Sequence, residues 1–225
     1  MRVDFQRPFT APAGAQDVIL VRHGSIDAYP PGESGPLAGG HSDPPLSASG
    51  RAQAEAVAAR LATYPIAALF VTTLRRTTET AAPLSARAGL EPVVLPGLRE
   101  VHLGEWEGGV IADRAARGDE EFQHVMREER WELIPGAEPR TAFIQRVLAG
   151  LDSVAAAAQP GMVAVAVTHS GVIAELCCQI TGSRPFAFLN CTNGSLTRVV
   201  RMPDGRWILV GFNDTAHLAA GGSPA

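Results

Sequence analysis

The chain has 225 residues, of which 46% are hydrophobic, and a formal net charge of −4. A chain of this size can bury a sizeable core as one domain, and its weak negative charge excludes a polyanion-binding signal, so we expect no nucleic acid and no membrane surface as partner. The apolar runs are too short to span a bilayer and the first residues lack a signal-peptide hydrophobic region, so we expect a cytoplasmic protein.

The cysteines and the basic residues limit the kinds of binding and metal site that we expect in this chain. Cys177, Cys178 and Cys191 form neither a disulfide framework nor a CxxC metal spacing, which fits a reducing compartment. All 19 basic residues are arginine, so every basic contact to a phosphate would come from a planar, permanently charged guanidinium. No carboxylate cluster or His/Cys spacing suits a metal ion, and we expect neither a metal nor a cofactor.

Strands and helices alternate in the first half of the chain. Ser47 or Ser49 would cap the first predicted helix, and Thr72 or Thr73 would cap the second. Paired prolines and glycines indicate a long loop before the first helix. In chain order we expect a flexible tail over 1–16, a strand over 17–22, a loop over 28–45, a helix over 49–63, a strand over 67–71, a helix over 75–88 and a short strand over 92–95.

The second half continues the pattern and ends in a hairpin. We expect small helices over 105–135, a helix with Pro139 in its first turn that ends near 158, a strand over 162–168, a helix over 171–181, strands over 195–202 and 206–212 joined by a turn, and a tail over 219–225. The alternation predicts an α/β three-layer sandwich. In this sandwich we expect a mostly parallel central sheet with helices on both faces. We expect the segment 105–135 to form a small helical cap over the functional site. One domain spans 17–218.

Two histidines follow apolar, β-branched runs of the kind that form buried parallel strands. The first run leads into Val21-Arg22-His23-Gly24, and the second leads into Val167-Thr168-His169-Ser170-Gly171. Arg75-Arg76 and Leu98-Arg99-Glu100 follow two other predicted strands. Because ligands bind at the carboxyl ends of the strands in open α/β sheets, these histidines, arginines and the glutamate predict a site for phosphate chemistry.

The ordered set of motifs resembles the histidine phosphatase superfamily, which has the phosphoglycerate mutase-like fold, and within it the phosphatase branch. The resemblance spans about residues 17–218. The matching stretches are Leu20-Val21-Arg22-His23-Gly24, Asp43-Pro44-Pro45-Leu46-Ser47, Leu74-Arg75-Arg76-Thr77, Leu98-Arg99-Glu100 through Gly108, Val167-Thr168-His169-Ser170-Gly171 and Phe212-Asn213-Asp214 through Leu218.

The resemblance implies a role for each of five residues. His23 would be the nucleophile that accepts the phosphoryl group, and Arg22 and Arg76 would hold the phosphate oxygens. His169 would be the second histidine of the phosphate pocket, and Glu100 would be the proton donor. The family spacing favours Arg76 over its neighbour, Arg75, which we expect at the surface or in a salt bridge.

Elementary chemistry supports these roles. A neutral imidazole can attack phosphorus without a separate base, and charge that spreads over the phosphoryl oxygens needs positioned positive groups. Two guanidiniums and a protonated histidine would supply them. We expect further phosphate contacts from Gly24, Ser25 and Ser170, through a backbone turn and a helix N-terminus.

Four other polar residues have weaker predictions. Whether His41 and Asp43, in the predicted loop, contact the substrate is left open. His102 is expected to pack or to line the rim of the site, and His217 to make a structural hydrogen bond.

The sequence specifies the reaction and the substrate less closely than it specifies the residues of the site. Ser25, Ile26 and Tyr29 stand where many family members carry an acidic residue, threonine and asparagine, so auxiliary phosphate donors are in doubt. The chain lacks the Trp-Asn and Gly-Trp pattern of the cofactor-dependent mutases. We therefore favour a metal-independent phosphomonoester hydrolase that acts on a small phosphate ester through a phosphohistidine. The alternatives are a phosphoglycerate-type mutase, which is an isomerase, and a catalytically silent phospholigand-binding domain. A homodimer is left open.

Overall fold

The computed structural model describes residues 9–27, 29 and 33–218 of the chain. The predicted tail over 219–225 and the first eight residues of the predicted tail over 1–16 lie outside the described residues. In the described part of that first tail, the Ala15 N–H donates a hydrogen bond of 3.0 Å to the Pro12 carbonyl oxygen. No helix in the described ranges is both long enough and apolar enough to cross a membrane.

A six-stranded sheet forms the centre of the molecule, in the order β5-β4-β6-β1-β7-β8. Neighbours among the first four of these are parallel, and β7 and β8 are antiparallel to their neighbours, as the predicted mostly parallel sheet with a late hairpin requires. The strands are β1 (Gln16–Arg22), β4 (Ile66–Val71), β5 (Val93–Val94), β6 (Val163–Thr168), β7 (Leu196–Arg201) and β8 (Trp207–Asp214).

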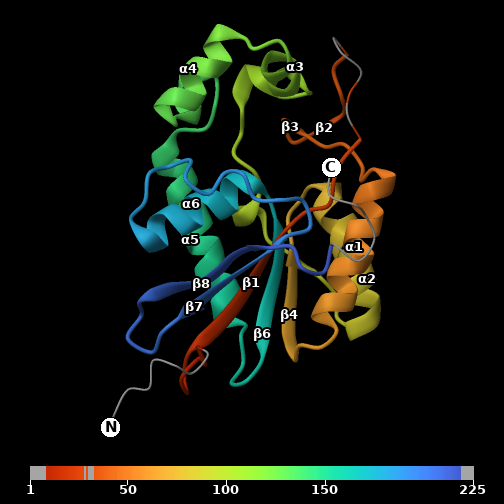
Figure 1. The fold of residues 1–225 in the computed structure, drawn as a ribbon, viewed down its shortest axis with the longest axis vertical. Helices are drawn as coiled ribbons and strands as arrows, with labels where there is room; N and C mark the ends of the chain where they lie inside the picture. Colours follow the sequence, from red (N-terminus) through yellow and green to blue (C-terminus); the bar gives the residue numbers. More distant parts are fainter. Residues whose placement is uncertain (1–8, 28, 30–32, 219–225) are drawn as a thin grey trace.

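Helices cover both faces of this sheet, which confirms the predicted sandwich (Figure 1). Successive side chains of a strand point to opposite faces, so Val18 and Leu20 pack with one helix pair while Ile19 and Val21 pack with the other. The first pair is α5 (Arg140–Ala156) and α6 (Ser170–Thr181), and the second is α1 (Ala48–Leu61) and α2 (Arg75–Ala88).

The helix starts were predicted with mixed success. The Ser47 hydroxyl caps α1 by accepting the Gly50 N–H at 3.1 Å. The predicted threonine cap of α2 is wrong, because its N-cap residue is Leu74 and makes no side-chain cap bond. Asp43, remote in sequence, accepts the Arg75 N–H at 2.8 Å instead. Pro139 is the N-cap residue of α5 and does not lie inside its first turn.

Small helices occupy the predicted cap segment and lie above the sheet in Figure 1. They surround a small cluster formed by Trp106, Val125 and Ile134. The elements are the 3-10 turns η2 (Gly104–Trp106) and η3 (Trp131–Leu133) and the helices α3 (Val110–Ala116) and α4 (Glu120–Glu128), and a further turn, η1 (Pro96–Leu98), precedes them.

The segment predicted as loop over 28–45 contains a short hairpin. β2 (Leu37–Ala38) pairs antiparallel with β3 (His41–Ser42). Gly39 and Gly40, the two residues between them, have φ values of +54° and +85°. Two consecutive positive φ angles are what a tight two-residue hairpin turn demands, so the Gly-Gly pair was the signal for this hairpin.

Candidate active site

The polar residues predicted at the strand ends meet above three neighbouring strands. His23 directly follows β1 and His169 directly follows β6, and these two strands pair with each other. The imidazole centroids lie 5.3 Å apart with the ring planes at 60°. Arg76 lies in the first turn of α2, just beyond β4, and is buried.

His23 is buried and holds a fixed orientation. Its Nδ1 lies 2.7 Å from the Gly24 carbonyl oxygen. A carbonyl can only accept, so Nδ1 carries the proton and Nε2 keeps its lone pair. Burial lowers the pKa of His23 well below its ordinary value, and the positive charges of Arg76 and Arg22 lower it further. The ring is therefore neutral at neutral pH, with a lone pair on Nε2.

The turn after His23 differs from the prediction. The Gly24 N–H donates to Thr80 Oγ1 at 3.0 Å, and the Ser25 N–H donates to Gln53 Oε1 at 2.8 Å. Both donors are used inside the protein, so the expectation that this turn offers free N–H groups to phosphate is wrong. Gly24 is needed for packing, because a Cβ there would lie 2.5 Å from the Gly50 carbonyl oxygen of α1.

The two arginines are each anchored at one nitrogen and unpaired at another. Arg22 donates from Nη1 to the Cys191 carbonyl, and Arg76 donates from Nη1 to the Ser42 carbonyl at 2.6 Å. The Nε atom of each arginine is buried and lacks a hydrogen-bond partner within the described residues. Buried donors without partners are costly in a protein interior. Both side chains are thus positioned to donate to a ligand.

His169 supplies a third unpaired nitrogen. Its Nε2 lies 3.0 Å from Thr72 Oγ1, while its buried Nδ1 lacks a partner in the described part of the chain. Burial lowers the pKa of His169 well below its ordinary value, and the charge of Arg76 adds to this. The protonated histidine expected from the sequence is therefore disfavoured until a phosphate dianion brings a compensating charge.

Glu100 reaches the same place from the segment that follows η1. Its Oε1 accepts the Val101 N–H at 3.0 Å and its Oε2 accepts the Gly171 N–H at 3.2 Å. Burial raises the pKa of Glu100 above its ordinary value, although these two N–H groups partly oppose the shift. A carboxyl group with a raised pKa can carry a proton to an oxygen atom.

A hydrogen-bond chain that the sequence did not reveal fixes Arg76. Glu107, in the cap segment, accepts the N–H of Ser42 at 2.7 Å with Oε2 and the N–H of Leu103 at 2.9 Å with Oε1. The Ser42 carbonyl then holds the Arg76 guanidinium. The cap is thereby linked to the Arg76 side chain through the β2–β3 hairpin.

The remaining candidates have structural contacts. The Nε2 atom of His41 lies 3.2 Å from the Glu100 carbonyl oxygen, and its ring lies 4.8 Å from that of His102. Asp43 is engaged at the start of α2. His217 Nε2 lies 2.9 Å from the Gly194 carbonyl oxygen, the predicted structural bond. Arg75 is exposed and pairs with Glu79 at 2.9 Å, as expected.

A pocket of about 290 Å³ opens beside these groups. Arg22, Glu100, Ser170 and Gly171 line its polar end. Within the described ranges no cluster of three or more His, Cys, Asp or Glu side chains could hold a metal ion. The arrangement can bind a phosphate group against a neutral imidazole, with a protonatable carboxyl group nearby.

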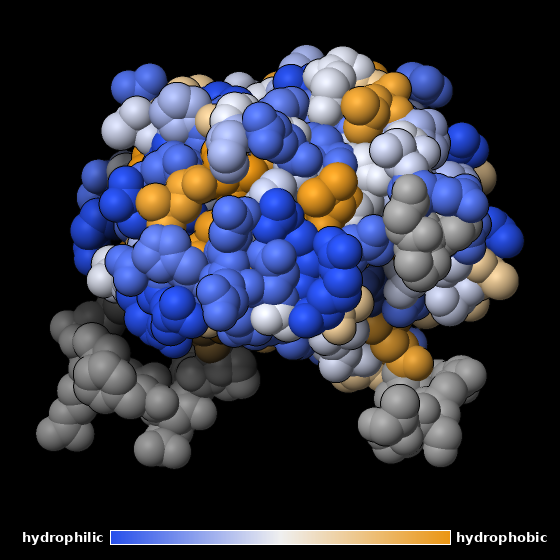
Figure 2. Space-filling model, turned by 90° about the horizontal axis from the view of Figure 1, so that it is seen from above, coloured by the Kyte–Doolittle hydropathy of each residue, from blue (hydrophilic) through white to orange (hydrophobic). Residues whose placement is uncertain are grey.

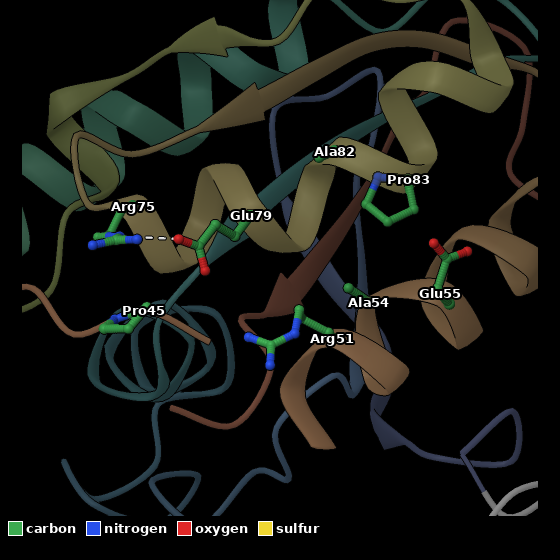
Figure 3. Close-up of a pocket in the computed structure, with 8 residues that line it drawn as sticks. All are labelled: Pro45, Arg51, Ala54, Glu55, Arg75, Glu79, Ala82 and Pro83. Atoms are coloured by element: carbon green, nitrogen blue, oxygen red, sulfur yellow. Dashed lines mark hydrogen bonds and ion pairs between the residues drawn. The ribbon is translucent and has the colours of Figure 1, made fainter. Parts of the chain in front are cut away.

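A separate pocket of about 440 Å³ lies between α1 and α2 (Figure 3). Its charged side chains are already engaged with protein groups. Arg75 pairs with Glu79, and Arg51 donates to the Leu46 carbonyl at 2.6 Å. Arg87, outside the pocket, pairs with Glu55 at 2.7 Å. Among the described residues, this pocket therefore lacks the buried unpaired donors of the strand-end site.

Comparison with known sequences gives one family. The sequence model of the histidine phosphatase superfamily (branch 1) matches residues 18–215. The probable phosphoglycerate mutase GpmB of Yersinia enterocolitica is 30% identical over 210 residues, which cover 89% of this chain and 94% of that protein. Phosphoserine phosphatase 1 of Hydrogenobacter thermophilus is 26% identical over 204 residues, which cover 89% and 93%.

Solved structures agree on the fold. A mycobacterial glucosyl-3-phosphoglycerate phosphatase superposes with a TM-score of 0.72 at 28% identity, covering 89% of this chain and 100% of that one. A phosphoglycerate mutase from Bacillus anthracis superposes with a TM-score of 0.73 at 21% identity, covering 93% and 97%. At that identity the second likeness shows the fold alone.

Proposed function

The chain belongs to the histidine phosphatase superfamily, and we propose that it is a phosphomonoester hydrolase that uses His23 as nucleophile on a small phosphorylated metabolite. The observation that carries the proposal is a set of three buried nitrogens, on Arg22, Arg76 and His169, which lack partners among the described residues and lie next to a neutral His23. Relatives named as phosphatases support hydrolysis.

In the first step the phosphate ester binds with its oxygens on Arg22, Arg76 and His169. The Nε2 lone pair of His23 attacks phosphorus in line with the leaving oxygen, so a P–N bond forms as the P–O bond breaks. Glu100 gives its proton to the leaving oxygen, which departs as an alcohol. The two guanidiniums stabilise the charge on the equatorial oxygens.

In the second step water attacks the phosphohistidine. The Glu100 carboxylate takes a proton from the water as the P–O bond forms and the P–N bond breaks. Inorganic phosphate leaves, and His23 and Glu100 return to their starting protonation states. The arginines supply the positive charge in both steps, so we propose a reaction that needs no metal and survives excess chelator.

A mutase is the second candidate, because a relative at 30% identity is named as a probable phosphoglycerate mutase. A mutase returns the phosphoryl group to a bound substrate and has to retain a bisphosphorylated intermediate away from water. Steady release of inorganic phosphate from a monophosphate, without a bisphosphate primer, would distinguish the hydrolase from the mutase.

The intermediate gives the direct test of the proposal. Rapid quenching after mixing with a 32P-labelled ester should trap acid-labile, base-stable label on the wild-type protein and none on His23→Ala. His124→Ala is the matched control, because His124 is exposed on α4. Label that persists in His23→Ala would contradict the assignment of the nucleophile.

A further inference from the structure

The pocket beside the phosphate-binding groups has two chemically distinct ends. Its polar end reaches Arg22 and Glu100, which the reaction uses. The other end is built from side chains of several separate segments, and nearly all of them are apolar. The polar one is Asn190, and the apolar ones are Val101, Leu103, Ile111, Phe122, Met126, Trp131 and Leu189.

The apolar end belongs to the cap side of the molecule. Ile111 comes from α3, Phe122 and Met126 come from α4, and Trp131 comes from η3. Viewed from above, hydrophobic residues interrupt a largely hydrophilic surface in the half where α4 lies (Figure 2). An alcohol joined to the phosphorus would extend from the polar end of the pocket toward these side chains.

This end of the pocket offers no positive charge to a second anionic group. Among the described residues that line the pocket, Arg22 and Glu100 are the charged ones. Arg114 stacks 4.9 Å from the Trp106 ring and pairs with Asp119 at 2.7 Å. Arg130, beside Trp131, pairs with Glu132 at 3.2 Å.

The other arginines near the reaction centre do not line this pocket, although the buried Nε atom of Arg99 also lacks a hydrogen-bond partner within the described residues. Arg146 holds both carboxylate oxygens of Glu138, and the Nη1 atom of Arg99 lies beside Gly39 on the β2–β3 side. Ser170 and Asn190 are the neutral polar residues that line the pocket, and the amide of Asn190 suits a hydroxyl or ether oxygen. A carboxylate in this place would lose its hydration without gaining a cation.

We propose that the physiological substrate is the phosphate ester of an uncharged, largely apolar alcohol, and that the pocket selects against phosphorylated acids. The proposal rests on the proposed function, because it assigns the leaving group of that reaction. A volume of about 290 Å³ stands at the small end of ligand pockets, so the alcohol is small. Each buried methylene should tighten binding about fourfold.

Binding of phosphonates tests the inference without any turnover. Titration calorimetry of the wild-type protein with ethyl-, propyl- and butylphosphonate should give dissociation constants that fall about fourfold for each added methylene. 3-Phosphonopropionate, which ends in a carboxylate, should bind at least tenfold more weakly than butylphosphonate. A flat alkyl series, or tighter binding of 3-phosphonopropionate, would overturn the proposal.

A charge placed in the pocket should reverse the preference. In Met126→Lys, butylphosphonate should bind at least tenfold more weakly and 3-phosphonopropionate more tightly. Gln123→Lys is the matched control, because it adds the same charge to α4 at an exposed position outside the pocket. Equal effects of the two variants would overturn the proposal, since the pocket would then have no part in selection.

Hydrolysis of acetyl phosphate separates the two proposals. Its acyl group is too short to fill the apolar end, so phosphate release from it tests the reaction centre alone. If acetyl phosphate is hydrolysed and the alkylphosphonate series is flat, the substrate inference fails and the proposed function stands. If acetyl phosphate is not hydrolysed and the series is graded, the proposed function fails and the pocket selectivity stands.

Discussion

Gly171 approaches the Glu100 carboxylate so closely that a Cβ at position 171 would lie 2.5 Å from Glu100 Oε1. The Gly171 N–H also donates to Glu100 Oε2. Position 171 therefore determines both where the carboxyl group lies and which hydrogen bonds it accepts.

Gly171→Ala should displace the proton donor without removing it. We expect kcat/KM for an alkyl phosphate to fall about 10²-fold, the effect of a 1 Å misplacement of a reacting group, with a smaller loss for p-nitrophenyl phosphate. Steady-state kinetics with the two substrates measures the difference. Gly211→Ala is the control, because a Cβ there meets nothing within 4 Å. A loss equal for both substrates would show that Gly171 acts on something other than proton donation.

Glu100→Gln should separate substrates by their need for a proton. Turnover of alkyl phosphates should fall about 10²–10⁴-fold, whereas p-nitrophenyl phosphate, whose leaving group hardly needs a proton, should lose much less. Arg76→Ala should slow both alike, because it removes a charge-assisted contact to the phosphate itself. If Glu100→Gln slows both equally, Glu100 positions another group.

The pH profile of the wild-type protein should reflect two opposite shifts. His23 has to be neutral, and because its pKa lies well below the ordinary value, activity should persist on the acidic side of pH 6.5. Glu100 has to be protonated, so turnover of alkyl phosphates should decline as the pH rises through its raised pKa. The decline should be absent with p-nitrophenyl phosphate, and its presence there would assign that limb to another group.

Glu107→Gln should weaken the positioning of Arg76, because Glu107 holds Ser42 and the Ser42 carbonyl holds Arg76. Glutamine has one acceptor oxygen, so it cannot hold both Ser42 and Leu103 as Glu107 does. We expect a drop in kcat/KM of about 10²-fold that is the same for good and poor leaving groups, together with weaker inhibition by inorganic phosphate. Glu105→Gln, at an exposed cap position, is the control. Unchanged phosphate inhibition would show that Glu107 does not position Arg76.

Burial of the two histidines should make stability depend on pH. The pKa values of His23 and His169 are well below their unfolded values near 6.5. Between the lowered pKa of each folded-state histidine and the unfolded value near 6.5, the unfolded chain binds more protons than the folded protein does. The free energy of unfolding should therefore fall as the pH drops below about 6.5, by up to about 1.4 kcal/mol per pH unit for each histidine.

Urea denaturation in a phosphate-free buffer at several pH values measures this slope, since phosphate would stabilise the folded state by binding. His169→Asn should have a shallower slope, whereas His124→Asn, on the exposed side of α4, should not. An unchanged slope in His169→Asn would mean that this ring is not the group whose protonation opposes folding.

The strand-end residues were predictable because their positions follow from local sequence. The apolar runs before His23 and His169 give buried strands, and parallel strands end at one edge of the sheet. The preference for Arg76 over Arg75 came from the family spacing, and the structure buries the first and exposes the second.

The supporting contacts were not predictable, because they join segments that are distant in the chain. The Asp43 carboxylate accepts a hydrogen bond from the Arg75 N–H at the start of α2, which is the role that a local threonine cap would have. Thr72 is instead engaged with Thr77 and His169. Glu107 meets Ser42 across 65 residues. Periodicity and capping rules describe neighbours along the chain, and they carry no information about such tertiary bonds.

The pairing of β1 with β6 places Arg22 directly opposite Thr168, so His23 and His169 each come one residue after a matched pair. Adjacent strands run about 4.8 Å apart, close to the 5.3 Å between the two rings. The pairing of the two strands therefore brings the imidazoles to this spacing, and the contacts of His23 with the Gly24 carbonyl and of His169 with Thr72 hold the rings there. The cap segment contributes neither strand, so a mutation there that alters the proposed alcohol pocket should leave the separation of His23 and His169 unchanged.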